Sequence, residues 1–303
     1  MAVMSTGDFA RSVAPQMPTW FGLGYNRNPD LISRLFNVIK SDQAVEEDIL
    51  VSGLGLVIQT SEGEETPYDS ARQGYIARYM HSDYRLGVIV TQNLIEDGKG
   101  LKIAEMRAKM LGIAVGETRN ILGHTVFNLA TDGTNAAGGD GQPLLSTAHP
   151  IIGGTVSNRL ATDADLSEAA LEQAYLEMGS ILDNRGLKVD VKPMKLLVAR
   201  ANRYEAHRIL KSDLRPGDLI NDTNALKDLG DYKDLIVSNY LTDDDAWFIL
   251  TDQDMQGLTW YDRKAPTFTN DTHFDTDNAK FKVHMRFSRG FTDFRCIFGS
   301  PGA

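Results

Sequence analysis

The sequence predicts an α+β fold in which one long helix is followed by a mixed α/β region and then by returning strands. Apolar residues recur at three- and four-residue steps between Leu101 and Thr131, which indicates the long helix. Apolar and polar residues alternate in residues 49–92 and again in residues 281–298, which indicates strands. Residues 141–258 switch between the two patterns, as a mixed α/β unit does.

The composition is that of a globular protein. The chain has 303 residues, of which 42% are hydrophobic and 24% charged, enough for a large core or two subdomains. It lacks both an apolar run long enough to span a membrane and the features of a signal peptide. Cys296 is alone, so an intrachain disulfide is impossible and a reducing, cytosolic origin is expected. The net charge of −10, without clustered Lys and Arg, argues against an electrostatic nucleic-acid binder.

The first 29 residues show little periodicity and contain several aromatic residues. We expect an extended arm whose aromatic side chains need a partner surface, the alternative being a disordered tail. Asn28 and Pro29 then have the residue types of a helix start. The candidate anchors among these aromatic residues are Trp20, Phe21 and Tyr25.

Residues 49–92 predict two strands joined by a long projecting loop. The first strand is indicated by the alternation of Leu54, Leu56 and Ile58, and the second by that of residues 86–90. Loops of this length in compact domains are usually functional or disordered, so the alternative is a solvated loop without a partner. The tip is acidic, with Glu62, Glu64, Glu65 and Asp69.

The long helix carries two apolar stripes and three glycines. Each glycine in a helix interior costs about 1 kcal/mol relative to Ala. The glycines therefore either let a neighbouring backbone approach closely or break the helix. They are Gly112, Gly116 and Gly123. One stripe contains Leu111, Val115, Thr118, Leu122, Val126 and Leu129. The second contains Ile103, Met106, Met110 and Ile113, so we expect much of the first half to be buried.

The remaining elements follow from capping and periodicity. A helix is expected over residues 166–183, with Ser167 as its cap and a stop at residues 184–186. In the last strands, Phe281, Val283, Met285 and Phe287 face one way and Lys282, His284 and Arg286 the other. Phe294, Cys296 and Phe298 repeat this pattern, so Cys296 is expected to be buried. Further strands are expected at 194–199, 235–237 and 246–250, and a helix at 201–210.

Motifs for catalysis or cofactor binding are missing from the sequence. It contains no phosphate-binding loop, dinucleotide fingerprint, nucleophile elbow or zinc helix, and its six histidines lack metal-ligand spacing. Asp252 begins a calcium-like loop, but Arg263 occupies the position of the required Glu. His149 near Asp140 is the remaining candidate for a catalytic base, and a structural histidine is the favoured interpretation. We predict no catalytic, cofactor-binding or metal-binding residues.

The order of these parts resembles the major capsid protein of tailed bacteriophages, which has the Hong Kong-97 type fold. It is most similar to the head subunits of Mu-like phages. The resemblance covers roughly Ile49 to Ala303 and rests on many weak motifs in the right order. They are residues 140–150, 184–186, Pro193 with 196–198, Ala206 with Ile209 and Leu210, 224–226, Tyr240 and Leu241 with 246–248, and 286–300.

The resemblance implies a division into five parts. Residues 1–48 would form the N-terminal arm, 49–92 the extended β-loop and 93–140 the peripheral domain with its spine helix. Residues 141–258 would form the axial domain, which surrounds the pentamer and hexamer axes. Residues 259–303 would return to complete the peripheral domain.

The implied function is structural. Subunits would assemble as pentamers and hexamers into the icosahedral head shell, which encloses double-stranded DNA without sequence-specific binding. The implied partners are further copies of the chain, a separate scaffolding protein, a portal and a decoration protein, with no cofactor and no membrane. The protein would be part of the virion and would be assembled in the host cytoplasm.

The resemblance also suggests where subunits meet. We expect the loop tip from Glu62 to Arg72 to lie on a neighbouring subunit's spine, with the arm aromatics as hydrophobic anchors. The three helix glycines would allow the spine to bend. Two alternatives stay open at this point: an encapsulin-like cellular shell protein, and an α+β enzyme with an unrecognised site around His149 and Asp140.

Overall fold

The computed structural model describes residues 16–70, 73–91, 100–134, 138–214, 223–253, 256–272 and 278–303. The chain forms two compact units, each built from segments that are distant in the sequence. The first unit contains the described parts of Met1–Glu46, Tyr79–Gly123 and Trp260–Arg289. The second contains those of Glu47–Arg78, His124–Thr259 and Gly290–Ala303. Among the described residues, no helix has the length and apolar character to cross a membrane.

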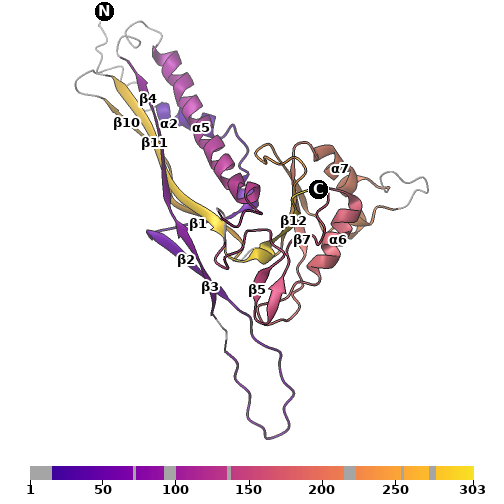
Figure 1. Ribbon diagram of the computed structural model, residues 1–303. Coiled ribbons are helices and arrows are strands. Elements are labelled where there is room, and N and C mark those ends of the chain that lie inside the picture. Colours follow the sequence, from indigo (N-terminus) through magenta and orange to yellow (C-terminus); the bar gives the residue numbers. More distant parts are fainter. Residues whose placement is uncertain are drawn as a thin grey trace, which may run out of the picture. The chain divides into compact units, whose positions relative to one another are not determined.

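The first unit is a four-stranded sheet with helix α5 (Gly100–Asn128) on one face (Figure 1). The strand order is β1-β10-β11-β4, and β11 pairs antiparallel with β4. The predicted alternation in β11 is confirmed, because its apolar residues are buried on the face toward α5. There the Trp260 ring stacks on Phe287 with a centroid distance of 4.3 Å. The strands are β1 (Asn37–Lys40), β4 (Ser82–Val90), β10 (Leu258–Thr272) and β11 (Ala279–Phe291).

The long helix is confirmed, and it continues without interruption through all three glycines. It ends at Asn128, three residues before the predicted end. The first stripe is partly confirmed, since Leu111 and Val115 are buried. The expected burial of the second stripe is wrong, because Met106 and Met110 are 50% and 57% exposed. Apolar periodicity alone does not tell which side of a helix meets its own unit.

The N-terminal segment is helical in its described part, so the expected extended conformation is wrong there. Helix α2 spans Met17–Tyr25 and is followed by the short helix α3 (Ile32–Leu35). The expected helix start at Asn28 is also wrong, because the N-cap of α3 is Leu31. The helix α2 packs against α5, and this tertiary contact stabilises a helix that its own sequence pattern does not predict.

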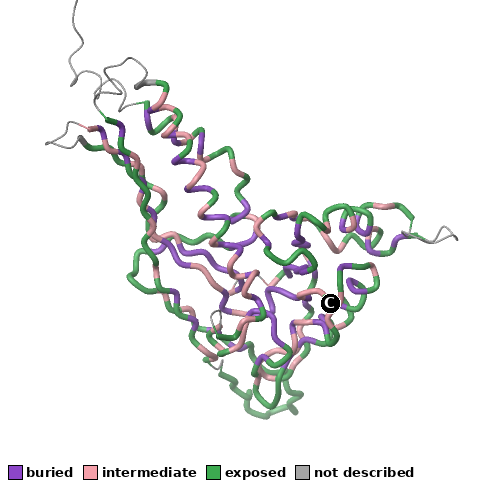
Figure 2. Tube along the Cα trace, turned by 45° about the horizontal axis from the view of Figure 1, so that its top comes forward, coloured by how far each residue is buried: buried purple, intermediate pink, exposed green. Residues whose placement is uncertain are grey.

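The strand expected at Leu54–Ile58 is absent from the structure. The pairing strands are instead β2 (Val45–Val51) and β3 (Gln73–Met80), and residues 52–70 between them form an irregular loop (Figure 1). Every residue from 53 to 70 is exposed, as the continuous green trace in Figure 2 shows. We call residues 52–70 the extended loop. Without a partner, alternation of apolar residues is insufficient to form a strand.

The second unit contains a four-stranded sheet of order β12-β9-β7-β8. Strand β7 pairs parallel with β8 and antiparallel with β9. The strands and helices predicted in this region are confirmed as strands and helices, with bounds that differ by a few residues. The strands are β7 (Pro193–Ala199), β8 (Asp234–Ser238), β9 (Trp247–Thr251) and β12 (Ile297–Ser300), with a separate hairpin of β5 (His149–Ile151) and β6 (Gly154–Val156). The helices are α6 (Glu168–Met178), α7 (Arg203–Lys211) and α8 (Ala225–Leu229).

Helix α6 buries Leu171, Ala174 and Met178 in the core of this unit. Its cap is confirmed, because the Ser167 Oγ accepts a hydrogen bond from the Ala170 amide at 3.2 Å. The helix ends at Met178, five residues before the predicted end. The predicted strand at residues 294–296 is wrong, since these residues form a 3₁₀ turn, η1 (Phe294–Cys296). Cys296 is buried as expected.

Candidate assembly surfaces

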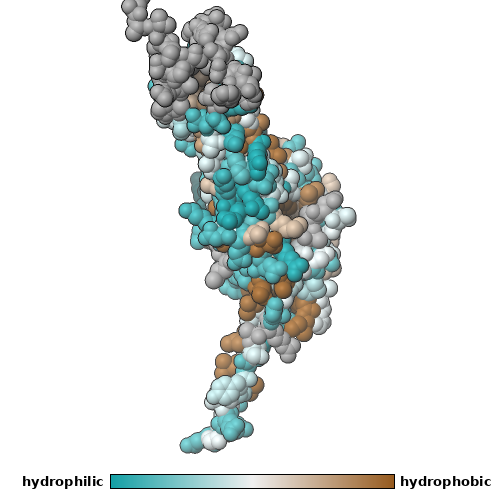
Figure 3. Space-filling view, turned by 90° about the vertical axis from the view of Figure 1, so that its left-hand side faces the viewer, coloured by the Kyte–Doolittle hydropathy of each residue, from teal (hydrophilic) through white to brown (hydrophobic). Residues whose placement is uncertain are grey.

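The extended loop presents its apolar residues to solvent. Leu54, Leu56, Val57 and Ile58 are 63%, 75%, 98% and 65% exposed, and Tyr68 is 96% exposed. Contiguous exposed apolar residues on a soluble protein mark interaction sites. Figure 3 shows brown atoms along the loop at the lower end of the picture. The loop is therefore the strongest candidate in this chain for a contact with another molecule.

The base of the extended loop is held by an ion pair within the second unit. The guanidinium of Arg185 donates to the carboxylate of Asp69 and, at 2.6 Å, to the carbonyl of Ser70. Asp69 also accepts a hydrogen bond from the Gly55 amide at 2.8 Å, which joins the two sides of the loop. We call these contacts among Gly55, Asp69, Ser70 and Arg185 the loop clasp. The hydrogen bond from Gly55, followed by that from Arg185, lowers the pKa of Asp69 to about 2.

The turn that carries Arg185 is itself fixed by the core. Arg295, only 4% exposed, donates to the carbonyl of Leu182 at 2.9 and 3.0 Å and to the Asn184 side chain at 3.0 Å. Gly186 closes the turn with φ of +79°, a conformation that favours glycine. The loop base is thus tied through Arg185 to a rigid part of the second unit.

The predicted tip residues have different roles. Glu62 and Glu65 are exposed and form no ion pair with another described residue. Glu64 accepts a hydrogen bond from the Ser61 amide at 2.7 Å and so stabilises the turn at the tip. Asp69, predicted as part of the charged tip, instead belongs to the loop clasp, so this prediction is corrected. Arg72 lies outside the described residues.

The arm aromatics lie within the first unit. Phe21 is buried and contacts Phe268 with a centroid distance of 5.6 Å and Tyr25 at 6.2 Å. Trp20 is half-buried and packs on the same cluster. Phe21 and Tyr25 therefore stabilise their own unit as placed, whereas Leu23, 60% exposed, presents an apolar side chain outward.

The helix glycines allow close packing of α2 on α5. A Cβ at Gly112 would lie 2.6 Å from the Tyr25 amide nitrogen and would overlap the Phe21 carbonyl oxygen. A Cβ at Gly116 would lie 3.4 Å from the Tyr25 carbonyl, and one at Gly123 would overlap the side-chain end of Ile32. Of the two alternatives for these glycines, the structure contains the close approach. Helix bending at these positions stays a prediction.

His149, the one candidate for a catalytic base, is fully buried in a polar network. Its Nδ1 lies 2.6 Å from Asp140 Oδ2, and its ring stacks on Phe294 with a centroid distance of 3.9 Å. Asn158 donates through Nδ2 to the carbonyls of residues 144, 294 and 297. The Asn158 Oδ1 therefore accepts from the Ser146 amide and from His149 Nε2, at 2.9 and 3.1 Å. Both imidazole nitrogens are used in structural hydrogen bonds, so His149 has no access to a substrate.

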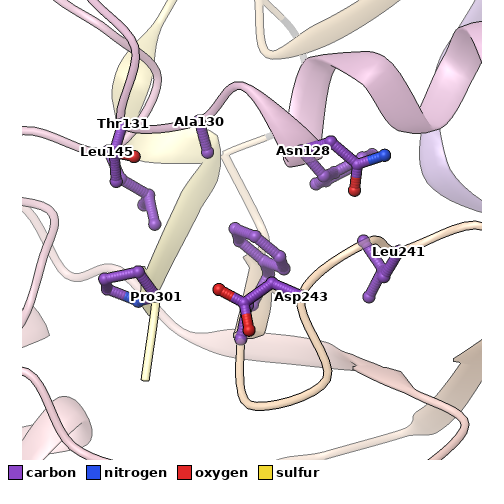
Figure 4. A pocket seen from close by; sticks show the side chains of 10 residues that line it. Asn128, Ala130, Thr131, Leu145, Leu241, Asp243 and Pro301 are labelled. Atoms are coloured by element: carbon purple, nitrogen blue, oxygen red, sulfur yellow. The ribbon is translucent and has the colours of Figure 1, made fainter. Parts of the chain in front are cut away.

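A small pocket lies at the C-terminal end of α5 in the second unit (Figure 4). Its volume is about 50 Å³, whereas ligand sites typically reach about 300–1,000 Å³. Asp243, Leu241 and Pro301 are among its lining residues. A pocket of this size accommodates only a few water molecules.

Comparison with known proteins identifies the family. Residues 82–299, which make up more than two thirds of the chain, match the family described as phage capsid protein. The chain belongs to this family. Its function is structural: it is a subunit of a phage capsid and part of the virion shell. The non-enzymatic role is thereby confirmed, and the cellular shell protein is not favoured.

Solved structures confirm the Hong Kong-97 type fold. A chain of the capsid structure of cyanophage P-SCSP1u is 12% identical, with a TM-score of 0.58 over 90% of this chain and 88% of that chain. The virus-like particle from Pyrococcus furiosus is 13% identical, with a TM-score of 0.54 over 94% and 98%. A chain of Microbacterium phage Oxtober96 is 13% identical, with a TM-score of 0.52 over the full length of both chains. No curated protein matches this sequence.

Proposed function

We propose that this chain is the subunit of a tailed-phage head and that it assembles as pentamers and hexamers into a closed icosahedral shell around double-stranded DNA. Family membership supports the capsid role. The observation that carries the assembly proposal is the extended loop, whose residues 53–70 are all exposed and include four neighbouring aliphatic side chains. Such a segment is stabilised only when another molecule covers it.

In this proposal the extended loop contacts a neighbouring copy. Its carboxylates at Glu62, Glu64 and Glu65 pair with Arg or Lys there, and its apolar residues exclude water. A single exposed ion pair contributes only about 0–1 kcal/mol, but a closed shell repeats the contact in every subunit. Replacing all three Glu residues with Lys should reduce particle yield while leaving the subunit soluble. Normal yield from this variant would refute the contact.

The arm is proposed to add a second contact between subunits. Trp20, half-buried, and the exposed Leu23 are the apolar side chains of α2 available for it. Trp is among the residue types most enriched in interface hot spots. Because α2 also packs on α5, the sharper test replaces Leu23 with Ser rather than deleting the arm. Lower shell stability with an unchanged melting temperature of the free subunit is expected, whereas unchanged shell stability would argue against the contact.

The remaining parts of the proposal come from the resemblance. The five-part division, with an arm to residue 48, a loop to 92, a spine part to 140, an axial domain to 258 and returning strands, is our proposed domain assignment. The motif at residues 140–150 supports the group of Mu-like head subunits. A separate scaffolding protein, a portal and a decoration protein are the proposed partners, and assembly takes place in the host cytoplasm.

Particle size tests the proposed function. The expressed chain, alone or with its scaffolding protein, should form closed megadalton particles in size-exclusion chromatography and electron microscopy. A small oligomer under both conditions would overturn the proposal. Portal and terminase genes beside the coding sequence are expected, whereas a neighbouring cargo enzyme gene would favour a cellular shell.

A further inference from the structure

The outer face of the sheet in the first unit is basic, although the chain as a whole is acidic. Because side chains alternate across a strand, the residues of β11 between its buried positions all point away from α5. In the β4–β11 register, Arg85 lies opposite His284 and Asp83 opposite Arg286, so these β4 residues share that face. We call this surface the basic face. It contains Arg85, Lys264, Lys280, Lys282, His284 and Arg286, with Asp83 as its carboxylate.

The sequence-based expectation that Lys and Arg do not cluster is wrong for this surface. The positions are distributed over three strands, so they come together only when the sheet forms. Figure 3 views the molecule from the side of this sheet and shows a broad hydrophilic patch above the middle of the picture. The alternation of Lys282, His284 and Arg286 was the signal in the sequence.

Three of the cations on the basic face form no direct ionic contact within the part of the chain that the structure describes. Arg85, Lys280 and Lys282 form no ion pair or hydrogen bond through their side chains among the described residues. The Nε of Arg286 is buried without a hydrogen-bond partner. A buried donor without a partner among the described residues is costly.

The carboxylate of Asp83 on the basic face is already used. Lys264 donates to His284 Nδ1 at 3.1 Å, so Nε2 carries the proton and donates to Asp83 at 2.8 Å. This hydrogen bond, together with Arg286 and Arg85, lowers the pKa of Asp83. The face therefore keeps a clear excess of positive charge.

The same chain carries an acidic segment without a partner. The extended loop contains no Lys or Arg between residues 52 and 70, and its tip turn presents Glu62 and Glu65 to solvent. In a shell of identical subunits, this segment is present in the same number of copies as the basic face. Complementary charges of this kind orient partners and exclude wrong ones.

We propose that the basic face is an interaction surface that receives the acidic tip of the extended loop from a second copy of this chain. The inference rests on the proposed shell function and specifies where on the neighbour the loop docks. From the sequence, the neighbour's long helix was expected to supply the pairing cations. In this proposal the neighbour's basic face supplies them instead. Nucleic acid is the less favoured occupant, because the chain carries a net charge of −10 and Asp83 lies within the face.

Reciprocal charge reversal tests this surface. The face variant carries Arg85→Glu and Lys282→Glu, and the tip variant carries Glu62→Lys and Glu65→Lys. Glu64 is left unchanged because it stabilises the tip turn. Each variant alone should lower the yield of closed particles at least tenfold, and the combination of both should restore most of it. Circular dichroism and the melting temperature of each subunit verify folding.

A matched control separates complementarity from net charge. Arg203 and Lys211 on α7 are exposed and belong to the second unit. The tip variant combined with Arg203→Glu and Lys211→Glu has the same net charge as the reciprocal variant but an unchanged basic face. It should stay impaired. Equal recovery with this control, or no recovery with the reciprocal variant, would overturn the proposal.

Two further outcomes are distinguishable. If the face variant assembles normally but no longer retains a short DNA duplex that the wild-type subunit binds, the face serves nucleic acid and the proposal is wrong. If the wild-type chain forms no closed particles with or without scaffold, the proposed shell function fails, and the inference fails with it. Normal wild-type particles with normal face-variant particles overturn the inference alone.

Discussion

Replacing Gly112 with Ala tests the close approach of α2 to α5 in the first unit. In an isolated helix, replacing glycine with alanine would stabilise the helix by about 1 kcal/mol, because glycine is the poorer helix former. Here the new Cβ would lie 2.6 Å from the Tyr25 amide nitrogen and would overlap the Phe21 carbonyl oxygen. Both obstacles are backbone atoms, which move only if the whole helix α2 shifts.

The magnitude follows from the balance of these two effects. Overpacking a well-packed site costs about 1–3 kcal/mol, so Gly112→Ala should be neutral to destabilising by about 2 kcal/mol. Gly22 on α2 is the matched control, since a Cβ there would meet nothing within 4 Å. Gly22→Ala should stabilise by about 0.5–1 kcal/mol. Gly123→Ala should lie between the two, because its overlap is with a side-chain end, that of Ile32, and the Phe36 and Trp260 rings lie at ordinary contact distances.

Thermal unfolding of the unassembled subunit measures the difference. At about 2–4 °C per kcal/mol for domains of this size, Gly112→Ala should melt several degrees below Gly22→Ala. Both variants keep an uninterrupted α5, so circular dichroism should show equal helix content. A Gly112→Ala variant that is stabilised as much as Gly22→Ala would show that α2 does not pack closely on α5.

Four further predictions concern the loop clasp, the Asn158 network and His81. Arg185→Ala should leave the melting temperature nearly unchanged but speed proteolysis of the extended loop. The control is Lys192→Ala, which breaks the exposed Lys192–Asp190 pair and should not speed proteolysis of the loop. Since the pKa of Asp69 is lowered to about 2, the clasp should persist from pH 7 to about pH 4 and be lost as the pH falls toward 2; loss of loop protection near pH 5 would contradict this. Asn158→Ala should lower the free energy of unfolding by about 3–5 kcal/mol in urea unfolding, because it leaves three carbonyls and the Ser146 amide without their partner. A loss below about 1 kcal/mol would contradict this role of Asn158. Burial, followed by Arg286, lowers the pKa of His81, so stability should decrease as the pH falls below about 6.5, and His81→Gln should weaken this dependence; an unchanged pH profile would argue against it.

The elements that could be predicted from the sequence are those whose signal is local. The Ser167 cap, the alternation in β11 and the periodicity of α5 each depend on residues only a few positions apart. The predictions were wrong where a contact between residues distant in the sequence determines the conformation of a segment. Helix α2 lacks an apolar pattern of its own and forms against α5, and residues 54–58 alternate as a strand does but have no strand to pair with.

The candidate surfaces divide in the same way. The extended loop and its acidic tip were predictable because their length and charge are contiguous in the sequence. The clasp between Asp69 and Arg185 was not, since 116 residues separate its members and neither belongs to a motif. Asn158, the centre of the His149 network, likewise gives no signal, because an asparagine shows its role only through the carbonyls around it.

The sequence by itself determined the long helix, the returning strands, the projecting acidic loop and, through its order of parts, the capsid family. Only the tertiary structure decided which faces of these elements are used. Burial of one face of β11 left Lys280, Lys282, His284 and Arg286 on the other, and pairing with β4 and β10 added Arg85 and Lys264. The physical reason is that periodicity fixes which residues share a face, whereas the packing of separate segments fixes what each face meets.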